Sequence, residues 1–193
     1  MPLTEPPESL TGFPAVALSK ASVLARVHRA DRHPVFFSTS DDGRFDLSPD
    51  GTLYFAGTDE GAFVEVFRSR LIPREEVAVR RLALVELGEE LTLADLTSAI
   101  ARGFGVTAAI HASPDYALCQ RWAAALHAEG FDGVYYRLSH DPSATEVGAA
   151  LFGPHEHVAQ RLIVVDDQPI SDELIERVRK RFGMLVLSTR RQS

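Results

Sequence analysis

Short runs in which apolar and polar residues alternate recur along the chain, and a few longer segments place apolar residues at helical spacing. Strict alternation is typical of half-buried strands, whereas a period near 3.6 is typical of a helix with one face in the core. The alternating and short apolar runs predict strands at Ser22–His28, Thr52–Ala56, Arg81–Leu87, Val134–Leu138, Ala149–Phe152 and Leu162–Val165.

Capping residues and helical spacing predict four helices. In most of them a Ser, Thr or Asp precedes the apolar face, and a glycine or a basic residue follows it. The predicted helices run from Thr58 or Asp59 through Arg68, over Leu93–Arg102, over Asp115–Glu129 and from Ser171 to Arg181. The apolar run Met184–Leu187 follows the last of these helices.

The mixture of strands and helices, without an internal repeat, predicts an α+β fold with mixed, mainly antiparallel sheets and flanking helices. A chain of 193 residues that is 45% hydrophobic is long enough for one domain with a single core. We therefore expect one domain over residues 1–193, with a core of about 22–165, an N-terminal arm over 1–20, and a C-terminal helix and strand over 170–188.

Composition excludes several classes of protein. The net charge of -7 argues against a nucleic-acid-binding surface, which needs clustered Lys and Arg. The single cysteine, Cys119, permits neither a disulfide framework nor a zinc site built from cysteines. No run of eighteen apolar residues predicts a membrane span, and MPLTEPPESLTGFP does not read as a signal peptide. We expect a cytoplasmic protein without nucleic-acid or membrane partners.

The candidate chemistry lies in charged and aromatic residues that the pattern places on turns and strand ends. The guanidinium groups of Arg26 and Arg44 offer planar forks of donors that match the oxygens of a diphosphate. Tyr54 offers a flat ring for stacking, and Glu65 a carboxylate that can stabilise developing positive charge near a ribose. Ser139, at the end of a predicted strand, is suited to binding a ribose or a carboxamide.

Each of these residues also has a purely structural interpretation. Arg44 follows two aspartates and precedes Asp46, so a surface ion pair is open to it. Tyr54 fits a core strand, and Glu65 lies among apolar helix residues where it either faces solvent or is held in a pocket. His28 shares a strand face with Arg26 and joins the candidate substrate-binding residues on that ground.

The order and spacing of the segments ARVHR, GRFD, GTLYFAGTDEGAFVEVF, GFDGVYYRLS and ALFGP resemble the RES-domain family, over about residues 23–154. The family's name abbreviates Arg, Glu and Ser. The resemblance implies a fold similar to ADP-ribosyltransferases and implies that Arg26, Arg44, Tyr54, Glu65 and Ser139 occupy the functional positions, with Glu65, Arg26 and Tyr54 as the catalytic residues. Around Ser139 the chain departs from the family pattern, because Arg137, His140 and an acidic, glycine-poor loop stand where the family often has small residues.

The resemblance also implies an activity and a partner. RES-type toxins consume NAD by hydrolysis or phosphorolysis, or ADP-ribosylate a protein, and Xre-type antitoxins occlude their active sites. The resemblance therefore implies cleavage of the nicotinamide–ribose bond, with NAD as substrate rather than as a resident cofactor. Water, inorganic phosphate and a protein side chain stay open as acceptors, and a non-catalytic partner-binding domain stays open as an alternative.

Nucleotide-binding and metal-binding motifs also bear on the kind of reaction that the chain can perform. The chain contains neither a G-x-G-x-x-G fingerprint after a strand nor a P-loop, so neither a Rossmann nucleotide site nor a P-loop site is expected, and hydride transfer is disfavoured. The HEH motif at His155–His157 supplies two imidazoles but no third ligand, so we expect a solvated loop and no metal.

Overall fold

The computed structural model describes residues 2–37, 42–155 and 158–187. An eight-stranded sheet dominates it, in the order β1-β6-β7-β8-β3-β2-β5-β9, and a small second sheet pairs β10 with β4. The strands are β1 (Ala15–Leu18), β2 (Val23–Arg29), β3 (Gly51–Ala56), β4 (Leu71–Pro73), β5 (Arg80–Leu87), β6 (Leu91–Asp95), β7 (Gly133–Arg137), β8 (Val147–Gly153), β9 (Leu162–Pro169) and β10 (Leu185–Leu187). The helices are α1 (Asp59–Phe67), α2 (Arg74–Ala78), the 3₁₀ helix η1 (Ala99–Phe104), α3 (Ala109–Ala112), α4 (Tyr116–Ala128) and α5 (Asp172–Phe182).

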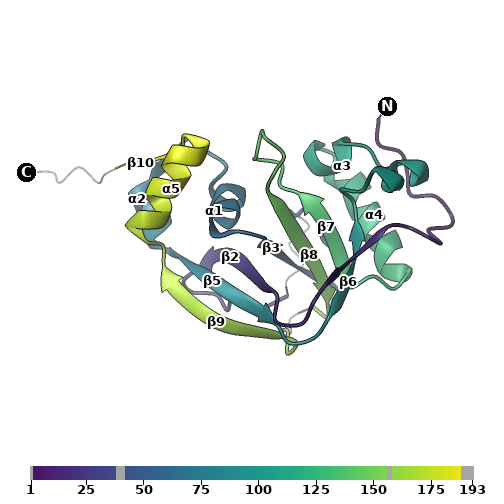
Figure 1. Ribbon diagram of the computed structural model, residues 1–193, viewed down its shortest axis with the longest axis horizontal. Helices are drawn as coiled ribbons and strands as arrows, with labels where there is room; N and C mark the ends of the chain where they lie inside the picture. The colour runs from purple at the N-terminus through teal and green to yellow at the C-terminus, as the bar shows by residue number, and fades with distance from the viewer. Residues whose placement is uncertain (1, 38–41, 156–157, 188–193) are drawn as a thin grey trace, which may run out of the picture.

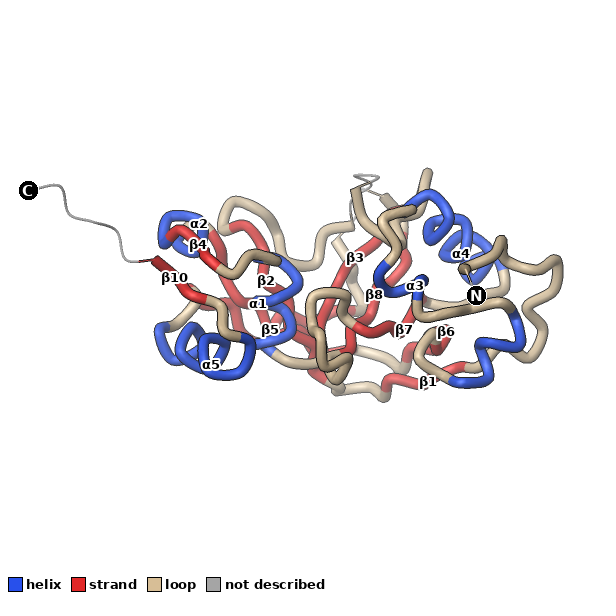
Figure 2. The backbone as a smooth tube through the Cα atoms, turned by 90° about the horizontal axis from the view of Figure 1, so that it is seen from above, coloured by secondary structure: helices blue, strands red, loops and turns tan. Residues whose placement is uncertain are grey.

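Neighbouring strands of the large sheet run antiparallel, apart from the parallel pair β6–β7. The sheet curls, with α1, α2 and α5 near one end and α3 and α4 near the other (Figure 1). Seen from above, the same two groups of helices lie apart along the length of the molecule (Figure 2). The fold-class prediction, α+β with mixed, mainly antiparallel sheets and flanking helices, is confirmed.

Apolar side chains fill both faces of the sheet. Strand alternation divides them, because successive side chains point to opposite faces. On β2, Leu24 joins one cluster and Ala25 and Val27 join the other. The larger cluster includes Trp122 of α4 and Phe63 of α1, which are fully buried. Both helices are thereby fixed against the sheet.

The sheet opens between β2 and β3. These two strands share only the register pair Ala25↔Ala56, whereas β2 pairs with β5 from Val23 to Arg29. The backbone oxygen of Tyr54 on β3 is free of β2 and accepts a hydrogen bond from Arg26 Nη1 at 3.2 Å. The divergence leaves room for a pocket in the middle of the sheet.

All six predicted strands are confirmed, with ends that differ by a few residues. The predicted helix at Leu93–Arg102 is wrong: β6 occupies Leu91–Asp95, and η1 follows at Ala99–Phe104. Strand β6 pairs with β1 on one side and β7 on the other, and this double pairing outweighs the local helical spacing. Its partner β1 lies within the segment expected to be an extended arm. No helix in the described ranges is long and apolar enough to cross a membrane.

Candidate functional site

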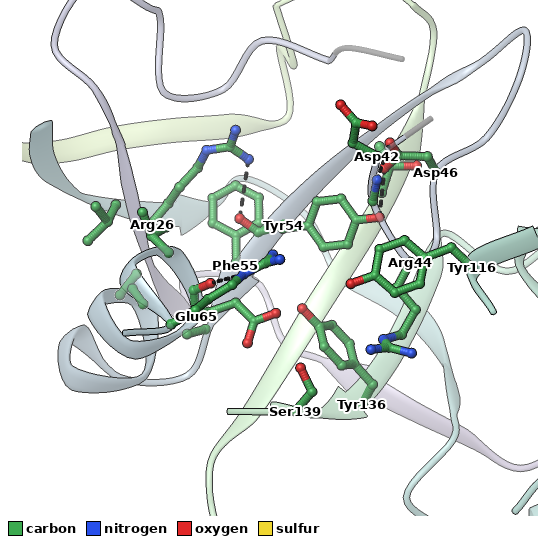
Figure 3. A pocket seen from close by; sticks show the side chains of 18 residues that line it. Arg26, Asp42, Arg44, Asp46, Tyr54, Phe55, Glu65, Tyr116, Tyr136 and Ser139 are labelled. Carbon is green, nitrogen blue, oxygen red and sulfur yellow. Dashed lines mark hydrogen bonds between the residues drawn. The ribbon is translucent and has the colours of Figure 1, made fainter. Parts of the chain in front are cut away.

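A cavity of about 380 Å³ lies at the opening between β2 and β3. Its walls come from both ends of the molecule: β2, β3 and α1 on one side, α4 and β7 on the other. The polar and aromatic lining residues are Arg26, Asp42, Arg44, Asp46, Thr52, Tyr54, Phe55, Glu65, Arg68, Tyr116, Tyr136 and Ser139 (Figure 3).

Arg26 is a cation with no carboxylate partner among the described residues. Its Nη1 donates to the Tyr54 carbonyl, its Cζ lies 5.8 Å from the centroid of the Phe55 ring, and its buried Nε has no hydrogen-bond partner within the described ranges. Burial lowers the pKa of the Arg26 guanidinium to about 10, so the group stays charged at neutral pH. A buried cation without a counter-ion is costly, and an anionic ligand removes that cost.

Glu65 reaches the cavity from α1. Thr58 caps this helix, since its Oγ1 accepts from Gly61 N at 2.9 Å, and the first turn carries the acidic Asp59 and Glu60. The Glu65 Oε2 atom is buried and has no hydrogen-bond partner in the described part of the chain. Burial raises the pKa of Glu65, and the positive charges of Arg68 and Arg44 oppose this effect. The site thus contains a carboxylate oxygen, Glu65 Oε2, that no described residue pairs by a hydrogen bond.

Tyr54 presents its ring rather than its hydroxyl to the cavity. The hydroxyl donates to Asp46 Oδ1 at 2.7 Å and accepts from Phe45 N at 2.8 Å. Burial, followed by the Asp46 charge, raises the pKa of Tyr54 well above its usual value. These two hydrogen bonds fix the ring plane, which is the requirement for a stacking surface.

Tyr136 and Ser139 face Glu65. In Figure 3 the side chains of Glu65, Tyr136 and Ser139 point toward one another, whereas Arg26 extends to the other side of Tyr54 and Phe55. The Tyr136 hydroxyl is buried without a partner among described atoms, and burial, with the Glu65 charge second, raises its pKa well above the usual value. Gly148 permits this packing, because a Cβ there would lie 3.0 Å from Tyr136 Cζ. Ser139 lies two residues beyond the end of β7.

Arg44 is held between two groups from the α3–α4 region. Its Nη1 donates to the Ser113 carbonyl at 2.6 Å, and its Cζ lies 4.8 Å from the centroid of the Tyr116 ring. Such a cation–π contact positions a guanidinium while leaving other donors open. The interactions differ from the surface ion pair that the neighbouring aspartates suggested.

The cavity therefore brings together five of the six residues predicted for the site: Arg26, Arg44, Tyr54, Glu65 and Ser139. His28 does not line it. Its Nε2 lies 3.1 Å from Asp167 Oδ1 on β9, and its Nδ1 lies 2.9 Å from the Arg29 carbonyl. On the curled strand, sharing a face with Arg26 does not bring His28 to the same cavity.

Sequence reasoning did not indicate the other seven polar and aromatic residues that line the cavity: Asp42, Asp46, Thr52, Phe55, Arg68, Tyr116 and Tyr136. Tyr136 had a signal, because it lies two residues from the buried Val134 and from the buried Leu138 and so shares the face of Val134 on β7. No group of three or more metal-ligating side chains occurs among the described residues. Of the HEH motif, Glu156 and His157 lie outside the described residues.

The curled sheet and its cavity define a small α+β protein whose central cavity is lined by arginines, tyrosines and one half-buried glutamate. The family model described as the RES domain matches residues 23–173. The chain belongs to the RES domain family.

A solved structure supports the fold. A chain of the M. tuberculosis MbcT–MbcA toxin–antitoxin complex aligns over 85% of this chain and 92% of its own length, with a TM-score of 0.67 and 18% sequence identity. At that identity the likeness concerns the fold alone. The search of curated proteins found no match.

Proposed function

We propose that this protein is a RES-type toxin that cleaves the nicotinamide–ribose bond of NAD. One observation carries the proposal: Arg26 Nε, Glu65 Oε2 and Tyr136 Oη are buried at one cavity without hydrogen-bond partners among the described residues. Buried polar atoms in folded proteins are nearly always paired, so three unpaired atoms at one cavity favour a ligand that pairs them. A dinucleotide offers a diphosphate, ribose hydroxyls and an aromatic ring to these groups.

In the proposed mechanism the arginines hold the diphosphate and Tyr54 stacks on a ring of the substrate. The bond between ribose and nicotinamide breaks, and its electron pair leaves with the nicotinamide nitrogen. Positive charge then builds on the ribose, and the Glu65 carboxylate stabilises it. Ser139 and Tyr136 donate or accept hydrogen bonds at the ribose or the carboxamide. The acceptor loses a proton as it bonds to the ribose carbon.

The proposal extends to the acceptor and the partner. Water, inorganic phosphate and a protein side chain each complete the reaction, because all three can attack the same ribose carbon. The likeness to a chain of a toxin–antitoxin complex supports an Xre-type antitoxin as the partner, one that binds over the cavity and keeps NAD out.

The test is nicotinamide release from NAD by the purified protein, followed by phosphorus NMR with and without inorganic phosphate. We expect release by wild type and a loss of about 100-fold or more in rate for Glu65→Gln, since one electrostatic contact to a transition state contributes on this scale. A phosphorylated ADP-ribose identifies phosphate as acceptor, and free ADP-ribose identifies water. Equal behaviour of wild type and Glu65→Gln, with both folded, would contradict the proposal and favour a binding domain.

A further inference from the structure

A second cavity, of about 520 Å³, adjoins the first at the carboxyl end of α1. Arg68 lines both cavities, so the two meet at its side chain. Part of the second cavity is formed by Arg181, Phe182, Gly183 and Met184, which lie beyond the segment that the RES model matches. The remaining lining residues are Val64, Ser69, Arg70, His140, Asp141, Pro142 and Ser143.

The carboxylates beside this cavity are already occupied. Asp141 accepts from the backbone N–H groups of Ser143, Thr145 and Glu146 and from the hydroxyls of Ser143 and Thr145. Glu146, which is 4% exposed, accepts from Thr58 Oγ1 at 2.5 Å and pairs with Arg181 Nη2. The negative charges of Asp141 and Glu146 therefore have their own protein partners.

Two guanidinium groups at the cavity keep spare donors. Arg68 uses Nε to donate to the Glu65 carbonyl at 2.9 Å, which leaves its two Nη atoms without a partner in the described ranges. The Arg70 side chain makes no hydrogen bond or ion pair with the described residues, and it lines the same cavity. The carboxyl-terminal ends of α1 and α5 each carry a partial negative charge of about half a unit. This charge stabilises nearby cations but uses none of their hydrogen-bond donors.

The backbone at Arg68 gives an independent indication. Arg68 ends α1 with a φ of 52°, in the left-handed region. Glycine is the usual residue at this position, because a Cβ there costs roughly 1–2 kcal/mol. A bulky cation at a strained position next to two cavities indicates that the side chain, and not the turn, is required.

We infer that Arg68 and Arg70 bind a phosphate group of the ligand at the junction of the two cavities. The identity of this ligand rests on the proposed function, whereas the binding itself does not require turnover. The phosphate belongs either to the diphosphate of the dinucleotide or to free inorganic phosphate. In both cases the recognition is the same, a planar guanidinium donating to phosphate oxygens.

The test is calorimetric titration of the wild-type protein, Arg68→Gly and Arg70→Gln with two probes, ADP-ribose and inorganic phosphate. Loss of one charge-assisted hydrogen bond predicts an increase in Kd of about tenfold for each variant. An increase for ADP-ribose alone assigns the site to the dinucleotide's diphosphate, and an increase for inorganic phosphate assigns it to free phosphate. Arg179→Gln, which removes an exposed arginine paired with Glu176 on the outer part of α5, is the matched control and should leave both Kd values within about twofold.

Folding does not confound this test, because glycine adopts the left-handed conformation at position 68 without strain. Unchanged Kd values in both variants, or no binding of either probe by wild type, would overturn the inference. Nicotinamide release is measured separately. Nicotinamide release together with unchanged Kd values for both probes in both variants rejects the inference and keeps the proposed function. Weaker probe binding in the two variants without nicotinamide release by wild type keeps the inference and rejects the proposed function.

Discussion

At the scale of single residues, Glu65 lowers the stability of the fold at neutral pH while serving the proposed function. Its Oε2 is buried without a partner in the described ranges, and burial raises the pKa of its carboxyl above 4.5. The folded chain therefore holds this proton more tightly than the unfolded chain. As pH rises from the unfolded value through the raised folded value, ionisation of Glu65 lowers the free energy of unfolding. A carboxylate kept at such a cost is consistent with a role toward a ligand.

Glu65→Gln should therefore raise the free energy of unfolding at pH 7 relative to wild type. The difference should shrink as pH falls below 4.5, where the wild-type carboxyl is protonated in both states. Urea unfolding at the two pH values measures this. Glu176→Gln is the opposite control, because hydrogen bonding to Arg179 lowers the pKa of Glu176 to about 2 and its replacement removes a stabilising charge. A less stable Glu65→Gln protein at pH 7 would show that the carboxylate has a stabilising partner.

At the scale of elements, α1 is the helix whose placement decides the site, because it carries Glu65. Thr58 caps the helix and also donates to Glu146 Oε2, while Arg177 of α5 pairs with Asp59 and Glu60 in the first turn. Gly61 permits the close approach, since a Cβ there would lie 2.7 Å from Glu146 Oε2. The C-terminal helix thus helps to hold α1 against the sheet.

Thr58→Ala should lower the free energy of unfolding by about 1–2 kcal/mol, because it removes the helix cap. It also leaves Glu146 Oε2 without its hydroxyl donor. Thr58→Ser keeps both hydrogen bonds and should stay within about 0.5 kcal/mol of wild type. Urea unfolding of the two variants checks this, and NAD cleavage should fall in the alanine variant alone. Equal stability of the two variants would show that the cap does not hold α1.

Helix α1 and strand β6 show which elements the sequence could predict and which it could not. The cap at Thr58 and the helix after it follow from local preferences and are confirmed. The strand β6 was mistaken for part of a helix, because a short segment such as LTLAD suits either period and its pairing with β1 and β7 is a tertiary fact. The contact between Thr58 and Glu146 spans 88 residues, and no local pattern indicates it.

At the scale of the whole molecule, the cavity draws its walls from β2 at one end of the chain to the segment after β7. Five of its residues could be predicted because motif order indicated them. Tyr116, Asp46 and Arg68 could not, since each reaches the cavity through packing that sequence spacing does not report. The prediction for His28 was wrong for a related reason. Its partner Asp167 lies on β9, at the sheet edge beyond β5, and the local sequence pattern does not indicate the order of strands in a sheet.

A ligand that contacts both sides of this cavity should stabilise the whole fold. Binding to the folded state alone raises the free energy of unfolding by about 2.7 kcal/mol at one hundred times Kd. ADP-ribose should therefore raise Tm, whereas adenosine at the same concentration, which lacks the diphosphate, should not. Arg26→Gln should lose most of the shift and yet unfold without ligand near the wild-type Tm, because it removes a buried cation that has no ion-pair partner among the described residues. Equal ADP-ribose shifts in wild type and Arg26→Gln would show that Arg26 does not bind the diphosphate. A strongly destabilised Arg26→Gln protein would instead show that its hydrogen bond to Tyr54 joins β2 to β3 where their register ends.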